Sequence, residues 1–419
     1  MSIPGPHNIT RRELTNGITI LVMENPASPT AVVSGYLAVG SADETDEQAG
    51  LAAFTADGLS RGTVNRTYDQ LYAAAESVGA SFGISAGTHT TSFGAKSLAE
   101  DLPLMLDLLA DALCRPTFPP DEIEKLRGEI LTDLEERAHD TGRMAALTFR
   151  ELAYPPGHPY HRSHTGTLET VSALTRDDLL CFHQRHYGPR GMVAVIVGDV
   201  ETERVLAQFE ATFGDWAGPV HERPSLPPVA RLSEARQKRV PIAGKTQADI
   251  VLGYPGPARA EPDFLDAMLC NTILGIFGMM GRLGKNVREE QGLAYYCYSL
   301  VEGGVGPGPW KVIAGVDPAN VEQAVESIRS EIRRIRAEPV EPGELDDSQA
   351  FLVGSLPLRL ETNEGLAASI LNMEQHGLGL DYMQRYEGLI GGITVERVQA
   401  AARRWLDPDA YALAIAGPP

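Results

Sequence analysis

The chain has 419 residues, of which 43% are hydrophobic and 22% are charged, and 56 acidic against 36 basic residues give it a net charge of −20. This acidity disfavours a nucleic-acid surface, which needs clustered Lys and Arg, and it disfavours docking on an anionic membrane. A hydrated acidic surface explains the charge, and an acidic chamber that prefers basic peptides is the alternative. The length is typical of two globular domains.

The N-terminal sequence MSIPGPHNITRRELTNG has no apolar signal core, and no later run approaches the roughly 20 apolar residues of a membrane span. The cysteines are widely spaced and form no C-x-x-C pair, which favours buried thiols in a reducing compartment over disulfides or a thiolate metal site. We therefore expect a cytoplasmic protein with no membrane segment. The four cysteines are Cys114, Cys181, Cys270 and Cys297.

In chain order, the first half starts with strand-like runs that include VVSGY at 32–36. A long amphipathic helix is predicted at 119–140, opened by Pro-Pro-Asp and with one apolar face formed by Ile123, Leu126, Ile130, Leu131 and Leu134. A shorter helix and a buried strand close this half at 174–198. The second half follows the same plan, from IVLGY at 250–254 to its own last helix and strand at 393–417.

The segments 174–198 and 393–417 align without a gap. In each, a Thr precedes a helix whose first turn carries acids, so we expect the Thr to cap that helix. A Pro then stops the helix, and a short apolar run, VAVIV or ALAIA, predicts a buried strand. The aligned pairs are Thr175 with Thr394, Arg185 with Arg404, Pro189 with Pro408, and Gly198 with Gly417.

Repeats of this length are whole domains rather than solenoid units. The Pro-rich and charged stretch between them predicts a linker at 219–236. The sequence therefore predicts an α+β protein of two homologous domains, at 1–218 and 237–419.

Several motifs resemble those of the insulinase/pitrilysin-type metallopeptidases, in their bacterial branch of chains with two homologous domains. The motifs run from NGITILVMEN through VGSADETDEQAGLAAF to LDPDAYALAIAGP, so the resemblance covers the whole chain. This branch is similar to the mitochondrial processing peptidase subunits and to core proteins of respiratory complexes. The resemblance implies that each domain is an antiparallel-rich mixed sheet packed against helices.

In that family, H-x-x-E-H and a distant Glu form a catalytic zinc site, in which two His bind the ion and the neighbouring Glu activates its water. Aligning GLAAFTADG with this motif puts Ala53 and Asp57 at the His positions and Ala56 at the general base, and the distant Glu falls at about Asp133. A methyl group neither binds zinc nor accepts a proton, and two carboxylates alone suit Zn²⁺ poorly. We therefore expect no metal and no cofactor in this chain.

The histidines elsewhere do not predict a metal site either. His158, His161 and His164 lie in PPGHPYHRSHTGT, where Pro and Gly break any helix that would align them. His183 and His186 lie on the repeated helix, and their counterparts in the second repeat are not ligands. We therefore expect these two histidines to serve ordinary packing.

The stretch VREEQGLAYYCYS resembles the family's C-terminal motif R-E-x-x-G-L-A-Y, and it aligns Arg288 and Tyr295 with the Arg and the Tyr of that motif. A guanidinium and a phenol can donate hydrogen bonds to the oxyanion of a tetrahedral intermediate and to substrate carbonyls. In the family this pair reaches the zinc from a different domain, so it can act from a different chain. The alternatives are a surface ion pair of Arg288 with Glu289 or Glu290, a core position for Tyr295, and a role for Tyr296 or Tyr298 in its place. Arg282 is interpreted as structural.

Three functions are compatible with these motifs. We favour the non-catalytic subunit of a heterodimeric zinc peptidase, in which a homologous H-x-x-E-H partner carries the zinc and an unfolded peptide is the substrate. The second is an inactive pseudoenzyme with a scaffolding role, like the respiratory-complex core proteins. The third, a hydrolase with an unrelated site, has no motif to support it. Whether the isolated chain is a monomer or a homodimer stays open.

Overall fold

The computed structural model describes residues 3–419, which form two compact units. The N-terminal unit comprises the described residues up to Leu134 together with Ser163–Ser225 and Pro357–Arg385, and the remainder forms the C-terminal unit. Each half of the sequence therefore gives one segment to the other unit. The sequence-based boundaries at 1–218 and 237–419 treat each half as continuous, and the compact units differ from them in these exchanged segments.

The N-terminal unit contains a six-stranded sheet of β1 (Thr10–Glu13), β2 (Thr19–Glu24), β3 (Thr30–Leu37), β4 (Ser81–Ala86), β5 (Thr91–Leu98) and β6 (Val193–Gly198). The strand order is β1-β2-β6-β3-β5-β4. Strands β2 and β6 are parallel and the other neighbouring strands are antiparallel, so the sheet is mixed and mostly antiparallel.

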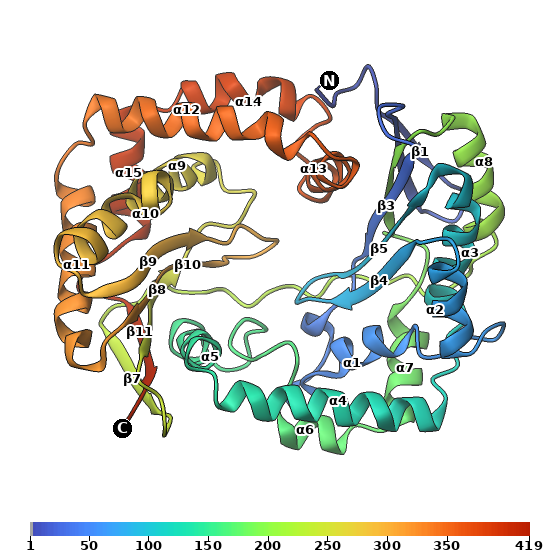
Figure 1. Ribbon diagram of the computed structural model, residues 1–419, viewed down its shortest axis with the longest axis horizontal. Helices are drawn as coiled ribbons and strands as arrows, with labels where there is room; N and C mark the ends of the chain where they lie inside the picture. Colours follow the sequence, from blue (N-terminus) through green and yellow to red (C-terminus); the bar gives the residue numbers. More distant parts are fainter. Residues whose placement is uncertain (1–2) are drawn as a thin grey trace. The chain divides into compact units, whose positions relative to one another are not determined.

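Helices pack on both faces of this sheet. Figure 1 shows α3 and α8 on one face and α13 on the other. The predicted helix at 119–140 is confirmed as α4. The α-helices that begin in this unit, apart from α14, are α1 (Leu51–Gly58), α2 (Tyr68–Glu76), α3 (Leu102–Cys114), α4 (Pro120–Ala138), α6 (Leu168–Ala173), α7 (Arg176–His186), α8 (Thr202–Phe213) and α13 (Asn363–Gln375).

The C-terminal unit contains a five-stranded sheet of β7 (Arg236–Pro241), β8 (Ala248–Pro255), β9 (Ala294–Val301), β10 (Pro309–Val316) and β11 (Ala412–Gly417). Its order is β7-β11-β8-β10-β9, and β7 and β11 are its parallel pair. The same order and directions occur in β2-β6-β3-β5-β4 of the first sheet. The predicted α+β fold with two similar sheets is thereby confirmed.

In this unit α5, which comes from the first half of the sequence, packs against β8 and β11, and α9 packs against β9 (Figure 1). The remaining helices are α5 (Thr141–Ala153), α9 (Phe264–Gly275), α10 (Phe277–Leu283), α11 (Val321–Ala337), α12 (Pro342–Arg359), α14 (Tyr382–Gly391) and α15 (Val395–Trp405).

The repeated helix and strand have the predicted local structure in both units. The Thr175 hydroxyl accepts a hydrogen bond from the Asp178 N–H at the start of α7, and the Thr394 hydroxyl accepts one from the Arg397 N–H at the start of α15. These caps satisfy N–H groups that a helix leaves without partners. The strands that follow, β6 and β11, are buried at every position, as expected for unalternating apolar runs.

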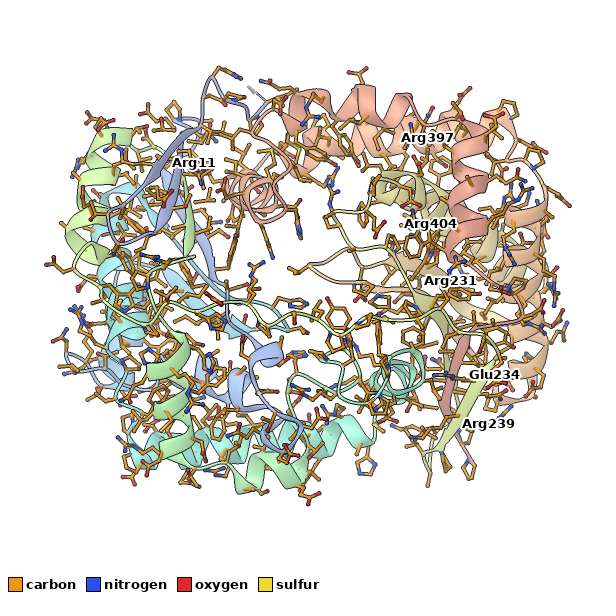
Figure 2. The ribbon with its side chains drawn as sticks, turned by 180° about the vertical axis from the view of Figure 1, so that it is seen from behind. Arg11, Arg231, Glu234, Arg239, Arg397 and Arg404 are labelled. Atoms are coloured by element: carbon orange, nitrogen blue, oxygen red, sulfur yellow. The ribbon has the colours of Figure 1, made fainter. Side chains whose placement is uncertain are left out.

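Polar contacts fix α13 to the N-terminal unit, although this helix comes from the second half of the sequence. Arg11 on β1, labelled in Figure 2, donates through Nη2 to Glu374 Oε1 at 2.8 Å. Asn363 Nδ2 donates to the Thr30 carbonyl oxygen at 3.2 Å. Between α8 and β7 the chain has no helix or strand, and the predicted linker 219–236 lies there except for its last residue.

Two further expectations concern cysteines and membranes. Cys270 and Cys297 are buried free thiols, but Cys181 is exposed, so the expectation of buried thiols is wrong for that residue. Along residues 3–419, no single helix is long and apolar enough to cross a membrane, and the pair Phe264–Gly275 and Phe277–Glu290 has the required length and composition only across a 90° bend.

Candidate functional site

Glu44 fixes the first turn of α1, the helix that corresponds to the zinc motif of the family. Its buried carboxylate accepts hydrogen bonds from the Gly50 N–H at 2.9 Å and from the Ala52 N–H at 2.8 Å. Gly50 has a φ of 96°, and a Cβ at this position would lie 2.9 Å from the Thr165 carbonyl oxygen. Gly50 and Glu44 are therefore needed for the folding of α1, which explains why they are present in a chain without the zinc ligands.

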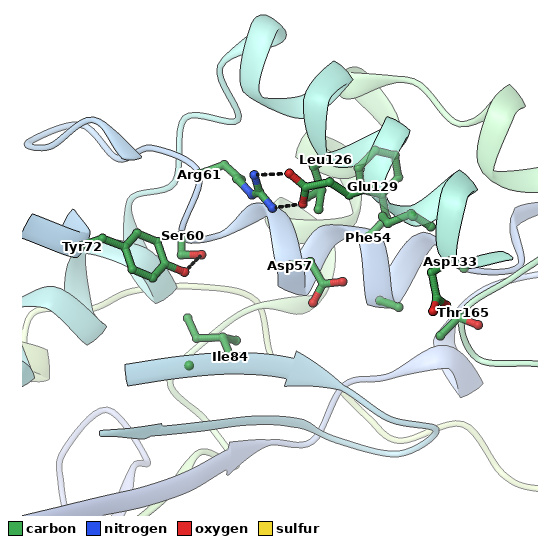
Figure 3. Close-up of a pocket in the computed structure, with 14 residues that line it drawn as sticks. Phe54, Asp57, Ser60, Arg61, Tyr72, Ile84, Leu126, Glu129, Asp133 and Thr165 are labelled. Atoms are coloured by element: carbon green, nitrogen blue, oxygen red, sulfur yellow. Dashed lines mark hydrogen bonds and ion pairs between the residues drawn. The ribbon is translucent and has the colours of Figure 1, made fainter. Parts of the chain in front are cut away.

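The positions of the two missing histidines face a cavity of about 400 Å³. Ala53 and Asp57 lie one helical turn apart on α1 and line this cavity, whereas Ala56 is fully buried. Glu129 and Asp133, one turn apart on α4, line the same cavity (Figure 3). The structure thus brings Ala53, Asp57 and Asp133 to one site, and it adds Glu129, which the sequence alignment did not select.

Arg61 supplies a positive charge among these acids. Its guanidinium makes a two-point ion pair with Glu129, with Nη1 at 3.2 Å from Oε1 and a shorter contact from Nη2 to Oε2 (Figure 3). Burial raises the pKa of Asp57 to about 6, although Arg61 acts to lower it, and the Glu129 carboxylate raises it further. Of the acids of this cavity, Glu129 is therefore paired, and Asp57 has a pKa close enough to neutrality to be partly protonated.

The cavity does not fit a catalytic zinc. Neither alanine has a donor atom, and Glu129 is engaged by Arg61. Among residues 3–419, no three His, Cys, Asp or Glu side chains converge in this cavity. Zn²⁺ prefers nitrogen and sulfur donors in a closed set of three or four, which these residues do not provide.

His158, His161 and His183 make contacts that the structure accounts for without a metal. The His158 ring is buried against Tyr154 and Tyr160, and its Nδ1 accepts a hydrogen bond from the Tyr160 N–H at 3.0 Å. His161 Nδ1 lies 2.9 Å from the Tyr154 carbonyl oxygen. His183 Nε2 lies 2.9 Å from the Leu113 carbonyl oxygen, and burial lowers the pKa of His183.

Tyr295 lies on β9, which is an edge strand of the C-terminal sheet. The register with β10 pairs Tyr296 with Gly315 and Ala294 with Val316, so Tyr295 is the extra residue of a β-bulge. Its side chain is 83% exposed, whereas the Tyr296 hydroxyl donates to the buried Asp249 carboxylate. A bulge of this kind interrupts the regular alternation of side chains along a strand. Here the side chain that it redirects is that of Tyr295.

Arg288 lies on the π-helical turn Gly284–Glu290 that leads into β9, and its side chain is half-buried. Within the described part of the chain, no hydrogen bond or ion pair engages its guanidinium, so the surface ion pair with Glu289 or Glu290 is not formed. Arg282, by contrast, is buried and paired with Glu344, with Nη2 at 2.5 Å from Oε2. This contrast agrees with a structural role for Arg282 and leaves Arg288 available.

The backbone just before Arg288 is strained in a way that the sequence analysis missed. Four consecutive residues, Gly278, Met279, Met280 and Gly281, have φ values of 46°, 55°, 89° and 65°. Left-handed φ values are uncommon for residues with a side chain, and such strain gathers at functional sites. The two methionines between glycines were the only sequence signal of this turn.

Comparison with known proteins places this fold and these motifs in one family. Residues 19–153 match the insulinase family, peptidase family M16, and residues 173–352 match the peptidase M16 inactive domain. Over 412 residues the chain is 29% identical to an uncharacterized zinc protease of Streptomyces coelicolor, covering 96% of this chain and 88% of that protein. It is 24% identical to mitochondrial-processing peptidase subunit beta of Lentinula edodes, covering 96% and 89% of the two chains.

Solved structures give the same result for the fold. The peptidase M16 inactive domain from Pseudomonas fluorescens has a TM-score of 0.90 at 24% identity, over 98% of both chains. A protease from Helicobacter pylori has a TM-score of 0.91 at 19% identity, over the whole of both chains. The chain therefore belongs to the insulinase (M16) peptidase family, as a non-catalytic member that lacks the donors of a zinc-dependent active site.

Proposed function

We propose that this protein is the non-catalytic subunit of a two-chain zinc peptidase. Its partner is a homologous chain with an intact H-x-x-E-H motif, which holds the zinc, and the pair hydrolyses an unfolded peptide. The observation that carries the proposal is the exposed, bulged Tyr295 seven residues after the unpaired Arg288. Because α1 lacks both histidines and the general base of the family motif, the same chain offers this pair no zinc site of its own.

Arg288 and Tyr295 would act on the peptide bound at the partner's zinc. The guanidinium is permanently charged and the phenol O–H is a neutral donor, so both can stabilise the oxyanion that forms on the attacked carbonyl. Neither residue has to gain or lose a proton in this role. We place this activity in the cytoplasm. The substrate class that we propose is an unfolded polypeptide, without a preferred sequence.

A scaffold without substrate is the competing function. A scaffold needs complementary surfaces, but it has no need of a solvent-exposed tyrosine on a bulge or of an unpaired, half-buried arginine. A core packing role for Tyr295 is excluded by its 83% exposure.

The partnership itself is tested by mixing this chain with a family relative that carries H-x-x-E-H and measuring the mass of the product by sedimentation velocity. We expect a complex of about twice the mass of one chain, because this architecture associates through similar surfaces. Hydrolysis of an unfolded peptide should appear in the mixture and not with either chain alone. Two independent species with no gain in hydrolysis would favour the scaffold.

A further inference from the structure

A second group of chemically active side chains lies in the N-terminal unit, away from the cavity lined by α1 and α4. Asp43 ends the 3-10 turn Ser41–Asp43, His186 is the last residue of α7, and His221 lies in the irregular segment after α8. One ligand atom from each of the three side chains can be chosen so that all lie within 4.8 Å of one another.

The Asp43 carboxylate needs a positive partner. Its side chain is 4% exposed, and Oδ2 accepts a hydrogen bond from the Gly40 N–H at 2.8 Å. In residues 3–419 no Lys or Arg forms an ion pair with it, and His221 is the only basic side chain at ion-pair distance. A buried carboxylate without a compensating cation is unfavourable, so this carboxylate is suited to binding one.

The two ring nitrogens of His221 face different side chains, and one of the two is buried without a hydrogen-bond partner. Its Nε2 lies 3.0 Å from Asp43 Oδ1, yet it has no partner aligned as a hydrogen bond. Its Nδ1 lies 3.3 Å from His186 Nδ1. Two ligands bound at about 2.1 Å to one metal lie about 3.0–3.4 Å apart for angles between about 90° and the tetrahedral angle, and the 3.0 Å between Nε2 and Oδ1 is at the short end of this range.

We propose that Asp43, His186 and His221 bind one divalent transition-metal ion, with Zn²⁺ as the ion that best fits two imidazoles and a carboxylate. A water molecule would complete a four-coordinate set. The Gly40 N–H supports the carboxylate from behind, as ligand-orienting groups do in metal sites. The sequence analysis predicted no metal in this chain and ordinary packing for His186, and this inference departs from both.

The ion would hold the irregular segment after α8, which contains His221, against the rest of the N-terminal unit. This segment has no helix or strand to hold it, and His221 is its contact with Asp43 and His186. Only 4% of the Asp43 side chain and 11% of the His221 side chain are exposed, which leaves little room for a substrate. The site is therefore structural, and it is independent of the function proposed for Arg288 and Tyr295.

The test uses untagged full-length protein that has been stripped with a chelator and then titrated with Zn²⁺ by calorimetry. We expect one Zn²⁺ per chain, and Co²⁺ in its place should give the visible absorption of a tetrahedral nitrogen and oxygen site. His221→Ala and Asp43→Asn should each weaken binding by at least about tenfold, the loss seen when even supporting groups of a metal site are removed. His139→Ala, at an exposed histidine, is the matched control and should bind like the wild type.

Circular dichroism of each stripped variant checks that it is folded, and His221→Ala remains a valid test if Asp43→Asn does not fold, because His221 lies outside helices and strands. A wild type that binds no stoichiometric Zn²⁺ would overturn the inference. So would a His221→Ala variant that binds Zn²⁺ as tightly as the wild type. Either result would leave Asp43, His221 and His186 as a group in mutual contact without a metal.

Discussion

Arg61 and Glu129 form a two-point ion pair at the cavity where the family's zinc site would lie, with Arg61 Nη1 at 3.2 Å from Glu129 Oε1. The guanidinium is a fixed cation among the acids of this cavity. Asp57 lies next to this pair, and burial raises its pKa to about 6. Both effects reduce the buried negative charge without a metal ion, which accounts for a fold that tolerates the absence of the two histidines.

We expect this cavity to bind no stoichiometric zinc and the isolated chain to hydrolyse no peptide, because Ala53 and Ala56 offer neither a ligand nor a base. The experiment uses the His221→Ala background, which removes the separate site proposed above. Metal analysis of that variant should find no zinc, and a fluorogenic peptide assay should show no turnover. Zinc that persists in His221→Ala but disappears on adding Asp57→Asn would assign the ion to the cavity and contradict this prediction.

Asp57→Asn should increase the free energy of unfolding at neutral pH. The folded pKa of Asp57 is about 6 against an ordinary value of 3.8, so the folded state binds the extra proton between these values. The stability linked to that proton is complete below 3.8 and is lost as the pH rises through 6. Asn mimics the protonated acid, so its advantage should be under about 1 kcal/mol at about pH 4 and about 3 kcal/mol at about pH 7.5, since each unit of pKa shift corresponds to about 1.4 kcal/mol.

Urea unfolding of the wild type and of Asp57→Asn at both pH values measures this difference. Asp215→Asn, at an exposed aspartate after α8, is the control for the effect of an Asp-to-Asn substitution on the surface. An Asp57→Asn variant that is less stable than the wild type at neutral pH would mean that the ionised carboxylate is stabilising. The interpretation that burial in this cavity disfavours the charged form of Asp57 would then be wrong.

Glu44→Ala should lower the free energy of unfolding by about 2–3 kcal/mol, because it removes the charged acceptor of two backbone N–H groups at the start of α1. Glu44→Gln retains one acceptor and should lose less. Thermal and urea unfolding measure both, with Glu210→Ala on the exposed side of α8 as the control. Equal stability of Glu44→Ala and the wild type would show that folding of α1 does not explain why this acid is present.

Local signals in the sequence predicted much of this fold. The Thr175 and Thr394 caps, the buried strands that follow them and the α4 helix are each determined by nearby residues, and all are present. The exchange of α5 and α13 between the units could not be predicted in this way. An apolar helix face shows that a helix is covered, but it does not show which of two similar sheets covers it.

The sites were partly predictable for a related reason. Alignment to a motif located Asp57 and Tyr295, but it did not locate Glu129, which lines the cavity one turn before Asp133 on α4 and pairs with Arg61. The bulge at Tyr295 depends on the register with β10, which no local pattern encodes. The approach of His221 to His186 joins a linker residue to a helix end that is 35 residues away in the chain.

The final prediction concerns Arg288 and Tyr295 acting on a peptide at the partner's zinc. In the reconstituted pair, Arg288→Ala and Tyr295→Phe should each lower turnover on the order of 100-fold, the loss seen when one oxyanion donor is removed. Arg288→Lys should recover only part of the activity, because an ammonium lacks the planar fork of the guanidinium. Steady-state hydrolysis of an unfolded peptide measures turnover, and sedimentation checks that every variant still pairs.

The design separates catalysis from stability. Tyr295 is 83% exposed, and Phe retains its ring, so Tyr295→Phe removes an O–H group without disturbing a core. Tyr298→Phe, on the same strand, is the matched control, and it should keep the wild-type turnover if Tyr295 is the donor. Because a donor to the oxyanion acts in the transition state, the loss should lie mainly in kcat rather than in KM. Full activity of both Arg288→Ala and Tyr295→Phe in a normally paired complex would remove the catalytic role and leave the scaffold as the better account of this chain.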